Sequence, residues 1–195
     1  PIVYPPWVSL ITDRSLCEGS KGLEWAVVRA VAGGINLVLL REKDLNPVML
    51  VALANRLRQI TWGKALLVIS ASTRSHIEAA LESGSDGVCL SEGGVSVPNA
   101  RSLIGTDMLI VGRSVHDLPG ATEAVNTGAD FLMAGSVFTT NSHPGMRTEG
   151  PALIERIASK VSVPVLGVGG ITAINASEVI KAGAAGVAMI RAVLC

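Results

Sequence analysis

Aromatic residues are scarce in this sequence. They make up 3% of the chain, whereas hydrophobic residues make up 49%. A core with few rings must be filled by Val, Ile, Leu and Ala, which is the filling that a parallel sheet buried on both faces requires. The composition therefore favours an α/β protein with a central parallel sheet.

Charge is also sparse and carries no excess of either sign. Charged residues make up 16% of the chain, and 16 basic side chains balance 16 acidic ones. No global field draws this protein to nucleic acid or to an anionic membrane, so neither is expected as a partner. A local site for a small anion stays open.

Cysteine and long apolar runs add further exclusions. Cys17, Cys89 and Cys195 form no CxxC pair and no metal-ligand spacing, which favours reduced thiols in the cytoplasm. No apolar run reaches the roughly 18 residues of a membrane span. The PIVYPPW start has no basic flank followed by an apolar stretch, so no signal peptide is expected.

Short apolar runs alternate along the chain with longer helical patterns. Strands are expected at Trp7–Thr12, Leu37–Leu40, Ala65–Ser70, Gly87–Leu90, Leu109–Val111, Phe131–Ala134, Val165–Val168 and Gly186–Ile190. The clearest helical patterns are Pro47–Ile60, Ser75–Ser83, Pro151–Lys160 and Asn175–Ala182. Repeated strand–helix alternation predicts a parallel sheet.

A weak internal repeat points to a closed barrel. The segments GINLVLL, GSDGVCL, GADFLMA and GAAGVAM each place a glycine after a helix, then two small or polar residues, then a strand. Four copies of two β/α pairs predict a single (β/α)8 TIM barrel over residues 1–195. The eighth strand is followed almost at once by Cys195, so the barrel is expected to lack its last helix, and the apolar VLC segment would need a cover, for which a partner subunit in a homo-oligomer is one candidate.

Reactive residues of such a barrel follow its strands. GVGGI places Gly169 and Gly170 directly after the seventh strand, where backbone N–H groups can approach a phosphate; a tight turn is the plainer alternative. Arg41 and Lys43 are expected to point together into the barrel mouth with Glu42 opposed, which suits an anionic ligand, although a surface ion-pair cluster is also open.

Histidines provide the candidates for proton transfer. His116, after the fifth strand, can take and give a proton near neutral pH, although a lone histidine is more often structural. His143 is expected to be a solvated loop residue or a weak phosphate contact, and His76 a structural or exposed residue. No metal constellation is found at the strand ends.

Together these strand ends resemble a known family, thiamine phosphate synthase and its sister, the TenI-type thiazole tautomerase. The matching segments are LITD, AGGINLVLLREK, GSDGVCL, GRSVH, GADFLMAGSVFTT, PVLGVGGI and AGAAGVAMI, in that order. The resemblance implies a TIM barrel that binds a small phosphorylated thiazole-type ligand.

The resemblance also separates two reactions. The synthase joins a pyrimidine pyrophosphate to a thiazole phosphate and needs Mg²⁺ held by aspartates. The aspartate positions are occupied here by Ser75 and Gly94, with the cation Arg74 beside the first. These changes and the GRSVH segment resemble the tautomerase branch, which uses no metal and no cofactor. The REK triplet resembles the synthase, and Glu92 offers a carboxylate at a shifted position.

Three hypotheses follow from the resemblance. The first is a metal-independent thiazole phosphate tautomerase with His116 as general acid and base. The second is a thiamine phosphate synthase with an altered Mg²⁺ site, and the third is a non-catalytic protein that binds thiazole or thiamine phosphate. In each, the resemblance and the strand ends assign substrate and phosphate binding to Arg41, Lys43, Arg74, Ser114, Thr140, Ser142, Gly169, Gly170, Ile190 and Arg191.

Overall fold

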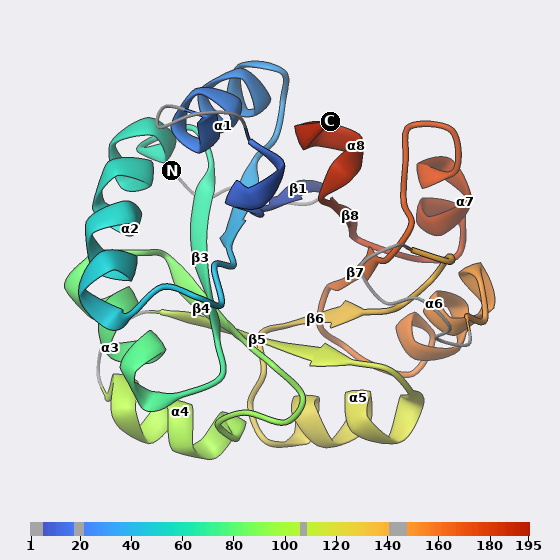
Figure 1. The fold of residues 1–195 in the computed structure, drawn as a ribbon. Helices are drawn as coiled ribbons and strands as arrows, with labels where there is room; N and C mark the ends of the chain where they lie inside the picture. Colours follow the sequence, from blue (N-terminus) through green and yellow to red (C-terminus); the bar gives the residue numbers. More distant parts are fainter. Residues whose placement is uncertain (1–5, 18–21, 106–108, 141–147) are drawn as a thin grey trace.

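Eight parallel strands surround one axis, and helices form an outer ring (Figure 1). The computed structural model describes residues 6–17, 22–105, 109–140 and 148–195. The strands are β1 Trp7–Ile11, β2 Leu37–Leu40, β3 Leu66–Ala71, β4 Gly87–Leu90, β5 Ile110–Val115, β6 Phe131–Ala134, β7 Val165–Val168 and β8 Gly186–Met189. The helices are η1 Arg14–Leu16, α1 Gly22–Ala32, α2 Pro47–Thr61, α3 Arg74–Glu82, α4 Val97–Ile104, α5 Leu118–Asn126, α6 Pro151–Ala158, α7 Ala176–Lys181 and α8 Arg191–Leu194.

Pairing between the first and the eighth strand closes the barrel. Each strand pairs in parallel with its neighbours in sequence, and β1 pairs with both β2 and β8. The register sets Trp7 opposite Gly186 and Leu10 opposite Met189. The predicted (β/α)8 TIM barrel is therefore confirmed. No helix among the described residues is both long and apolar enough to cross a membrane.

The internal repeat has a physical cause that the sequence alone did not reveal. The third residue of each of the first three copies accepts a hydrogen bond from a backbone N–H at the start of the preceding strand. These bonds join Asn36 to Val8 at 2.9 Å, Asp86 to Leu67 at 2.7 Å and Asp130 to Val111 at 2.7 Å. An N–H group at a strand start needs such a partner. In these three copies, the third residue therefore couples neighbouring strands at their amino-terminal ends.

Two rings lie inside the barrel, although the composition predicted an interior of aliphatic residues. Trp7 and Phe131 meet edge to face, with ring centroids 5.9 Å apart and planes at 80°. Two glycines allow this close packing. A Cβ on Gly112 would lie 2.1 Å from the Phe131 ring, and a Cβ on Gly186 would lie 2.3 Å from the carbonyl oxygen of Trp7 and 2.9 Å from its Cβ. These strand glycines serve close packing rather than flexibility.

Two predicted boundaries were wrong. β5 runs on to Val115, so Arg113 and Ser114 lie within the strand rather than after it. The eighth helix was expected to be missing, whereas α8 begins at Arg191 and follows β8 without a loop. Val193 and Leu194 of α8 pack against the core of the same chain. The chain itself therefore covers part of this apolar segment.

Candidate active site

A cavity of about 720 Å³ lies at the mouth of the barrel, where the strands end. Side chains and backbone from the segments after nearly every strand line it, as expected for the carboxyl ends of parallel strands. Among the residues predicted for the site, those that line this cavity are Arg41, Lys43, Ser114, His116, Thr140, Gly169, Gly170, Ile190 and Arg191.

Among the described residues, one that was predicted for the site does not line this cavity. Arg74 lies at the start of α3, its Nε donates to Glu78 at 2.7 Å, and its side chain is 71% exposed. It makes an ordinary i,i+4 surface pair instead of contacting the cavity. Ser142, like His143, lies outside the described residues.

His116 is fixed by a contact on each ring nitrogen. Its Nδ1 donates a hydrogen bond to the carbonyl oxygen of Gly135, and its Nε2 lies 3.4 Å from the Glu92 carboxylate. Because a carbonyl supplies no proton, Nδ1 carries the hydrogen, and the neutral ring presents its lone pair on Nε2. The ring is 38% exposed and lines the mouth, so it is not a core histidine.

Arg113 ties the loop after β4 to β5. Its two terminal nitrogens donate to the carbonyl oxygens of Val95 at 2.9 Å and Glu92 at 2.7 Å. The same loop carries the Glu92 carboxylate that faces His116. Arg113 therefore fixes a neighbouring loop and is not itself one of the residues that line the cavity.

The GVGGI segment brings the loop after β7 close to the loop after β6. Gly169 and Gly170 have φ angles of +101° and +62°, a region that L side chains rarely adopt. A Cβ on Gly169 would lie 2.8 Å from the Cα of Ser136, and a Cβ on Gly170 would lie 2.5 Å from the carbonyl oxygen of Thr139. Both glycines line the cavity, so backbone and not side chains forms this part of its wall.

Cations stand on two sides of the mouth. Arg41 and Lys43 follow β2, and Arg191 follows β8. Glu42, between the first two, is buried, and its carboxylate accepts from the backbone N–H of Arg14 at 3.2 Å. All three residues of the triplet line the cavity, and Glu42 turns its carboxylate toward Arg14. Burial raises the pKa of Glu42 above its ordinary value.

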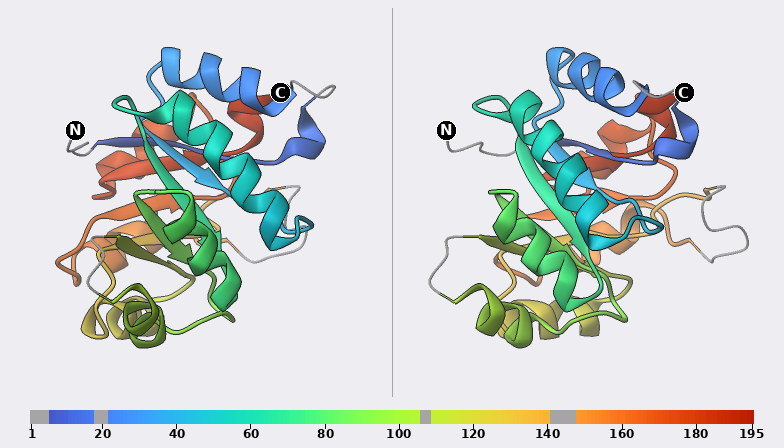
Figure 2. Two further views of the ribbon diagram at one scale, coloured as in Figure 1. Left: turned by 90° about the vertical axis from the view of Figure 1, so that its left-hand side faces the viewer. Right: turned by 60° about the vertical axis from the view of Figure 1, so that its left-hand side comes forward.

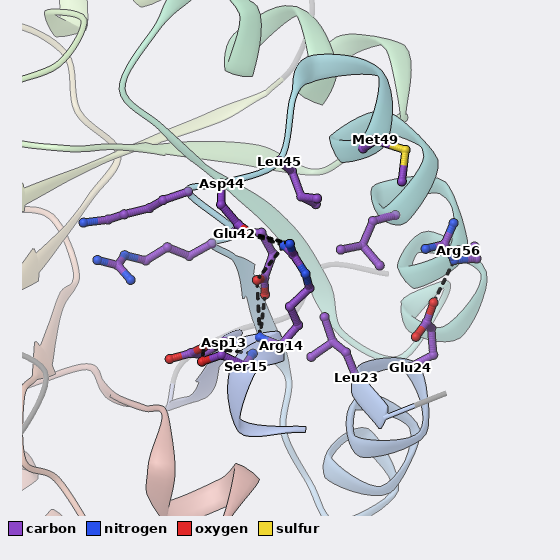
Figure 3. Close-up of a pocket in the computed structure, with 13 residues that line it drawn as sticks. Asp13, Arg14, Ser15, Leu23, Glu24, Glu42, Asp44, Leu45, Met49 and Arg56 are labelled. Carbon is purple, nitrogen blue, oxygen red and sulfur yellow. Dashed lines mark hydrogen bonds and ion pairs between the residues drawn. The ribbon is translucent and has the colours of Figure 1, made fainter. Parts of the chain in front are cut away.

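Figure 3 shows a second pocket, of about 640 Å³, which borders the mouth and lies between η1, α1 and the loop before α2. Arg14 reaches across it to Glu42 and Asp44, and its Nη1 lies 2.8 Å from Asp44. Arg56 pairs with Glu24 at 2.7 Å on the far side. The ion pairs of Arg14 join the loop after β1 to the loop after β2, which carries Arg41 and Lys43. The pair of Arg56 with Glu24 joins α2 to α1.

Sequence reasoning missed His76 as part of the mouth. Its Nδ1 accepts from the backbone N–H of Ser72 at 3.2 Å, so its neutral ring carries the proton on Nε2. Burial lowers the pKa of His76 and favours that neutral form. The sequence signal that could have placed His76 at the mouth is its position in the first turn of α3, which begins shortly after β3 ends. The two histidines of this cavity therefore have opposite tautomers.

The Mg²⁺ site implied by the synthase resemblance does not fit the residues present. Ser75 supplies a hydroxyl, and a Cβ on Gly94 would lie 2.6 Å from Ser91 Oγ and 2.7 Å from Ser72 Cα. A carboxylate therefore has no room at position 94. Within the described ranges, no group of three His, Cys, Asp or Glu side chains is arranged to hold a metal ion. Mg²⁺ prefers several carboxylate or phosphate oxygens.

Comparison with known proteins identifies the family. A family model described as thiamine monophosphate synthase, which includes the TenI proteins, matches residues 8–193. The chain belongs to this family.

Relatives and a solved structure agree with that assignment. The chain is 40% identical over 190 residues to a putative thiamine-phosphate synthase of Geobacter sulfurreducens, covering 95% of this chain and 85% of the relative. It is 36% identical over 187 residues to a thiamine-phosphate synthase of Haloarcula marismortui, covering 94% and 86%. The structure of a thiamine phosphate pyrophosphorylase from Pyrococcus furiosus superposes with a TM-score of 0.84 at 33% identity, covering 96% of this chain and 87% of that one.

These names support the transferase, which was the second choice from the sequence. They do not support the isomerase that the sequence placed first. The family is thus established, and the reaction is argued below from the residues of the site.

Proposed function

We propose that this family member binds a phosphorylated thiazole in the barrel mouth and moves a proton within it, as a metal-independent tautomerase. The observation that carries this proposal is His116, whose ring lines the mouth and presents the Nε2 lone pair. Gly169 and Gly170 would hold the phosphate by close backbone approach. Arg41, Lys43 and Arg191 would hold the anionic groups of the ligand.

The chemistry balances without a further reactant. Nε2 of His116 takes a proton from a carbon of the ligand, and the C–H bonding electrons enter the conjugated system of the thiazole. The imidazolium then returns the same proton to another atom of that ligand. The product is an isomer, and the enzyme regains its starting state. A histidine suits both steps because its ordinary pKa lies near neutral pH.

Thiamine phosphate synthesis is the second candidate, and the names of the relatives favour it. The REK triplet at Arg41–Lys43 suits a pyrophosphate equally well. Against it stands the packing at Gly94, which leaves no room for a metal-holding carboxylate at that position. The third hypothesis, binding without turnover, is favoured by no described contact.

One pair of assays separates the three. The purified protein is given a thiazole carboxylate phosphate alone, or a thiazole phosphate with a pyrimidine pyrophosphate, each with Mg²⁺ and with EDTA. We expect isomerisation that is equal in Mg²⁺ and in EDTA, and no condensation. Mg²⁺-dependent condensation would establish the synthase instead. Ligand binding by calorimetry with neither reaction would establish the non-catalytic protein.

The His116→Gln variant tests the residue that carries the proposal. It removes the acid–base group and retains a side chain that can donate to Gly135. Turnover should fall by about 10²–10⁴-fold, the usual contribution of a general acid and base. Circular dichroism and ligand affinity should stay as in the wild type. Near-wild-type isomerisation by this variant would remove His116 from the mechanism.

A further inference from the structure

The loop after β4 brings a carboxylate to the reactive nitrogen of His116. Glu92 Oε2 lies 3.4 Å from Nε2, the ring atom that presents the lone pair. Glu92 is itself exposed, with a side-chain accessibility of 62%, so it reaches the ring from the open side of the mouth. Among the described residues, no other carboxylate lies within ion-pair distance of the His116 ring.

The position of Glu92 is fixed through its backbone rather than its side chain. The guanidinium of Arg113 donates to the carbonyl oxygen of Glu92 at 2.7 Å and to that of Val95 at 2.9 Å. Arg113 and His116 stand on one strand and its immediate end. β5 thus holds both the histidine and the loop that brings the carboxylate to it.

We propose that Glu92 is a positioning residue that stabilises His116 while its ring holds the proton in transit, and that Arg113 keeps Glu92 in place. This inference rests on the proposed function. When Nε2 gains a proton, the ring becomes a cation that can donate to the Glu92 carboxylate. In this role Glu92 exchanges no proton with the ligand.

The other charged groups near this ring do not duplicate the effect. Arg113 is a cation, and its guanidinium donates hydrogen bonds to two backbone carbonyl oxygens. Asp117, next to His116 in sequence, accepts from the N–H of Gly120 at 2.8 Å as the N-cap of α5. Glu92 is therefore the anion placed to act on Nε2.

The first test is the isosteric Glu92→Gln variant. It keeps the shape of the side chain and removes the charge. We expect kcat for isomerisation to fall about tenfold and KM to change less than twofold, because Glu92 acts on the ring and not on the ligand. Glu92→Asp should recover part of kcat, and Glu82→Gln, an exposed glutamate at the end of α3, is the matched control. Unchanged kcat in Glu92→Gln would overturn the inference.

The second test needs no substrate, so its failure is distinct from failure of the proposed function. At acidic pH, the Nε2–H of the protonated His116 ring is followed by NMR in the wild type and in Glu92→Gln. Its exchange with water should be faster in Glu92→Gln, because the carboxylate that would accept its hydrogen bond is gone. Arg113→Gln, which releases the loop, should give a smaller change in the same direction. Equal exchange in the wild type and in Glu92→Gln would show that the carboxylate does not act on His116.

Discussion

At the scale of single residues, glycine at position 169 combines two requirements that can be tested separately. Gly169 has a φ of +101° and would bring a Cβ within 2.8 Å of Ser136, whereas Gly34 has a φ of +104° and open space around it. A left-handed backbone costs an L residue about 1–2 kcal/mol at either site. The contact with Ser136 adds a cost at position 169 alone.

Gly169→Ala should therefore destabilise the protein more than Gly34→Ala does, and it should weaken phosphate binding by at least about tenfold, since wall and ligand compete for the same space. Urea unfolding gives the first comparison, and calorimetry with inorganic phosphate gives the second. Gly34→Ala is the control for backbone strain and should bind phosphate normally. Equal phosphate affinity in the two variants would show that this loop is not the phosphate site.

The buried carboxyl of Glu42 leads to a prediction about how folding stability depends on pH. Burial raises the pKa of its carboxyl in the folded protein, against hydrogen bonds from Thr12 and Arg14 that lower it. The folded state therefore holds this proton more tightly than the unfolded chain does. The contribution of Glu42 to stability is greatest below its ordinary pKa of about 4.3 and is lost as pH rises through the raised value.

The wild type should accordingly lose stability relative to Glu42→Gln as pH rises from about 4 to about 7. Urea unfolding of both proteins across this range provides the measurement. Glu155→Gln, an exposed glutamate on α6, controls for removal of one carboxylate elsewhere. A difference in stability that grows with pH in favour of the wild type would contradict the assignment.

At the scale of elements, the repeated acidic residue before a strand holds two β/α units together. Asp86 accepts from the N–H of Leu67 at 2.7 Å and also from Arg58 of α2 at 2.7 Å, and its side chain is 26% exposed. Asp130 repeats the arrangement with Arg101 of α4 at 2.6 Å. The first copy has Asn36 in this place, so the backbone bond does not need a charge.

Asp86→Ala should cost about 1–3 kcal/mol, because it leaves a strand N–H and an arginine without their acceptor. Asp86→Asn should cost less, since an amide oxygen still accepts from Leu67, as Asn36 does for Val8. Both values come from urea unfolding. Equal losses in the two variants would mean that the ion pair with Arg58 provides the stability and the backbone bond does not.

At the scale of the whole molecule, the sequence predicted the barrel well because a strand buried on both faces is a short apolar run between helices. The rim was predictable for a related reason, since parallel strands all end at one edge. His116, Gly169 and Gly170 were found in this way. The contacts between loops were not predictable, because they join residues far apart in the chain. Two such contacts are the hydrogen bond from Arg113 to the carbonyl oxygen of Glu92 and the close packing of Gly94 against Ser72.

The pairing of β1 with β8 has a consequence for how this protein is made. On the ribosome, β1 emerges first, and its second neighbour is the last strand of the barrel to be synthesised. Until then the barrel cannot close, and β1 has β2 as its only partner from the barrel. An unpaired strand edge invites pairing with other chains. Because Gly186 has no side chain, β8 can lie directly against the backbone and Cβ of Trp7 in this final pair. The barrel can therefore close only after the last strand has been synthesised, and incomplete chains must be kept from pairing with one another until then.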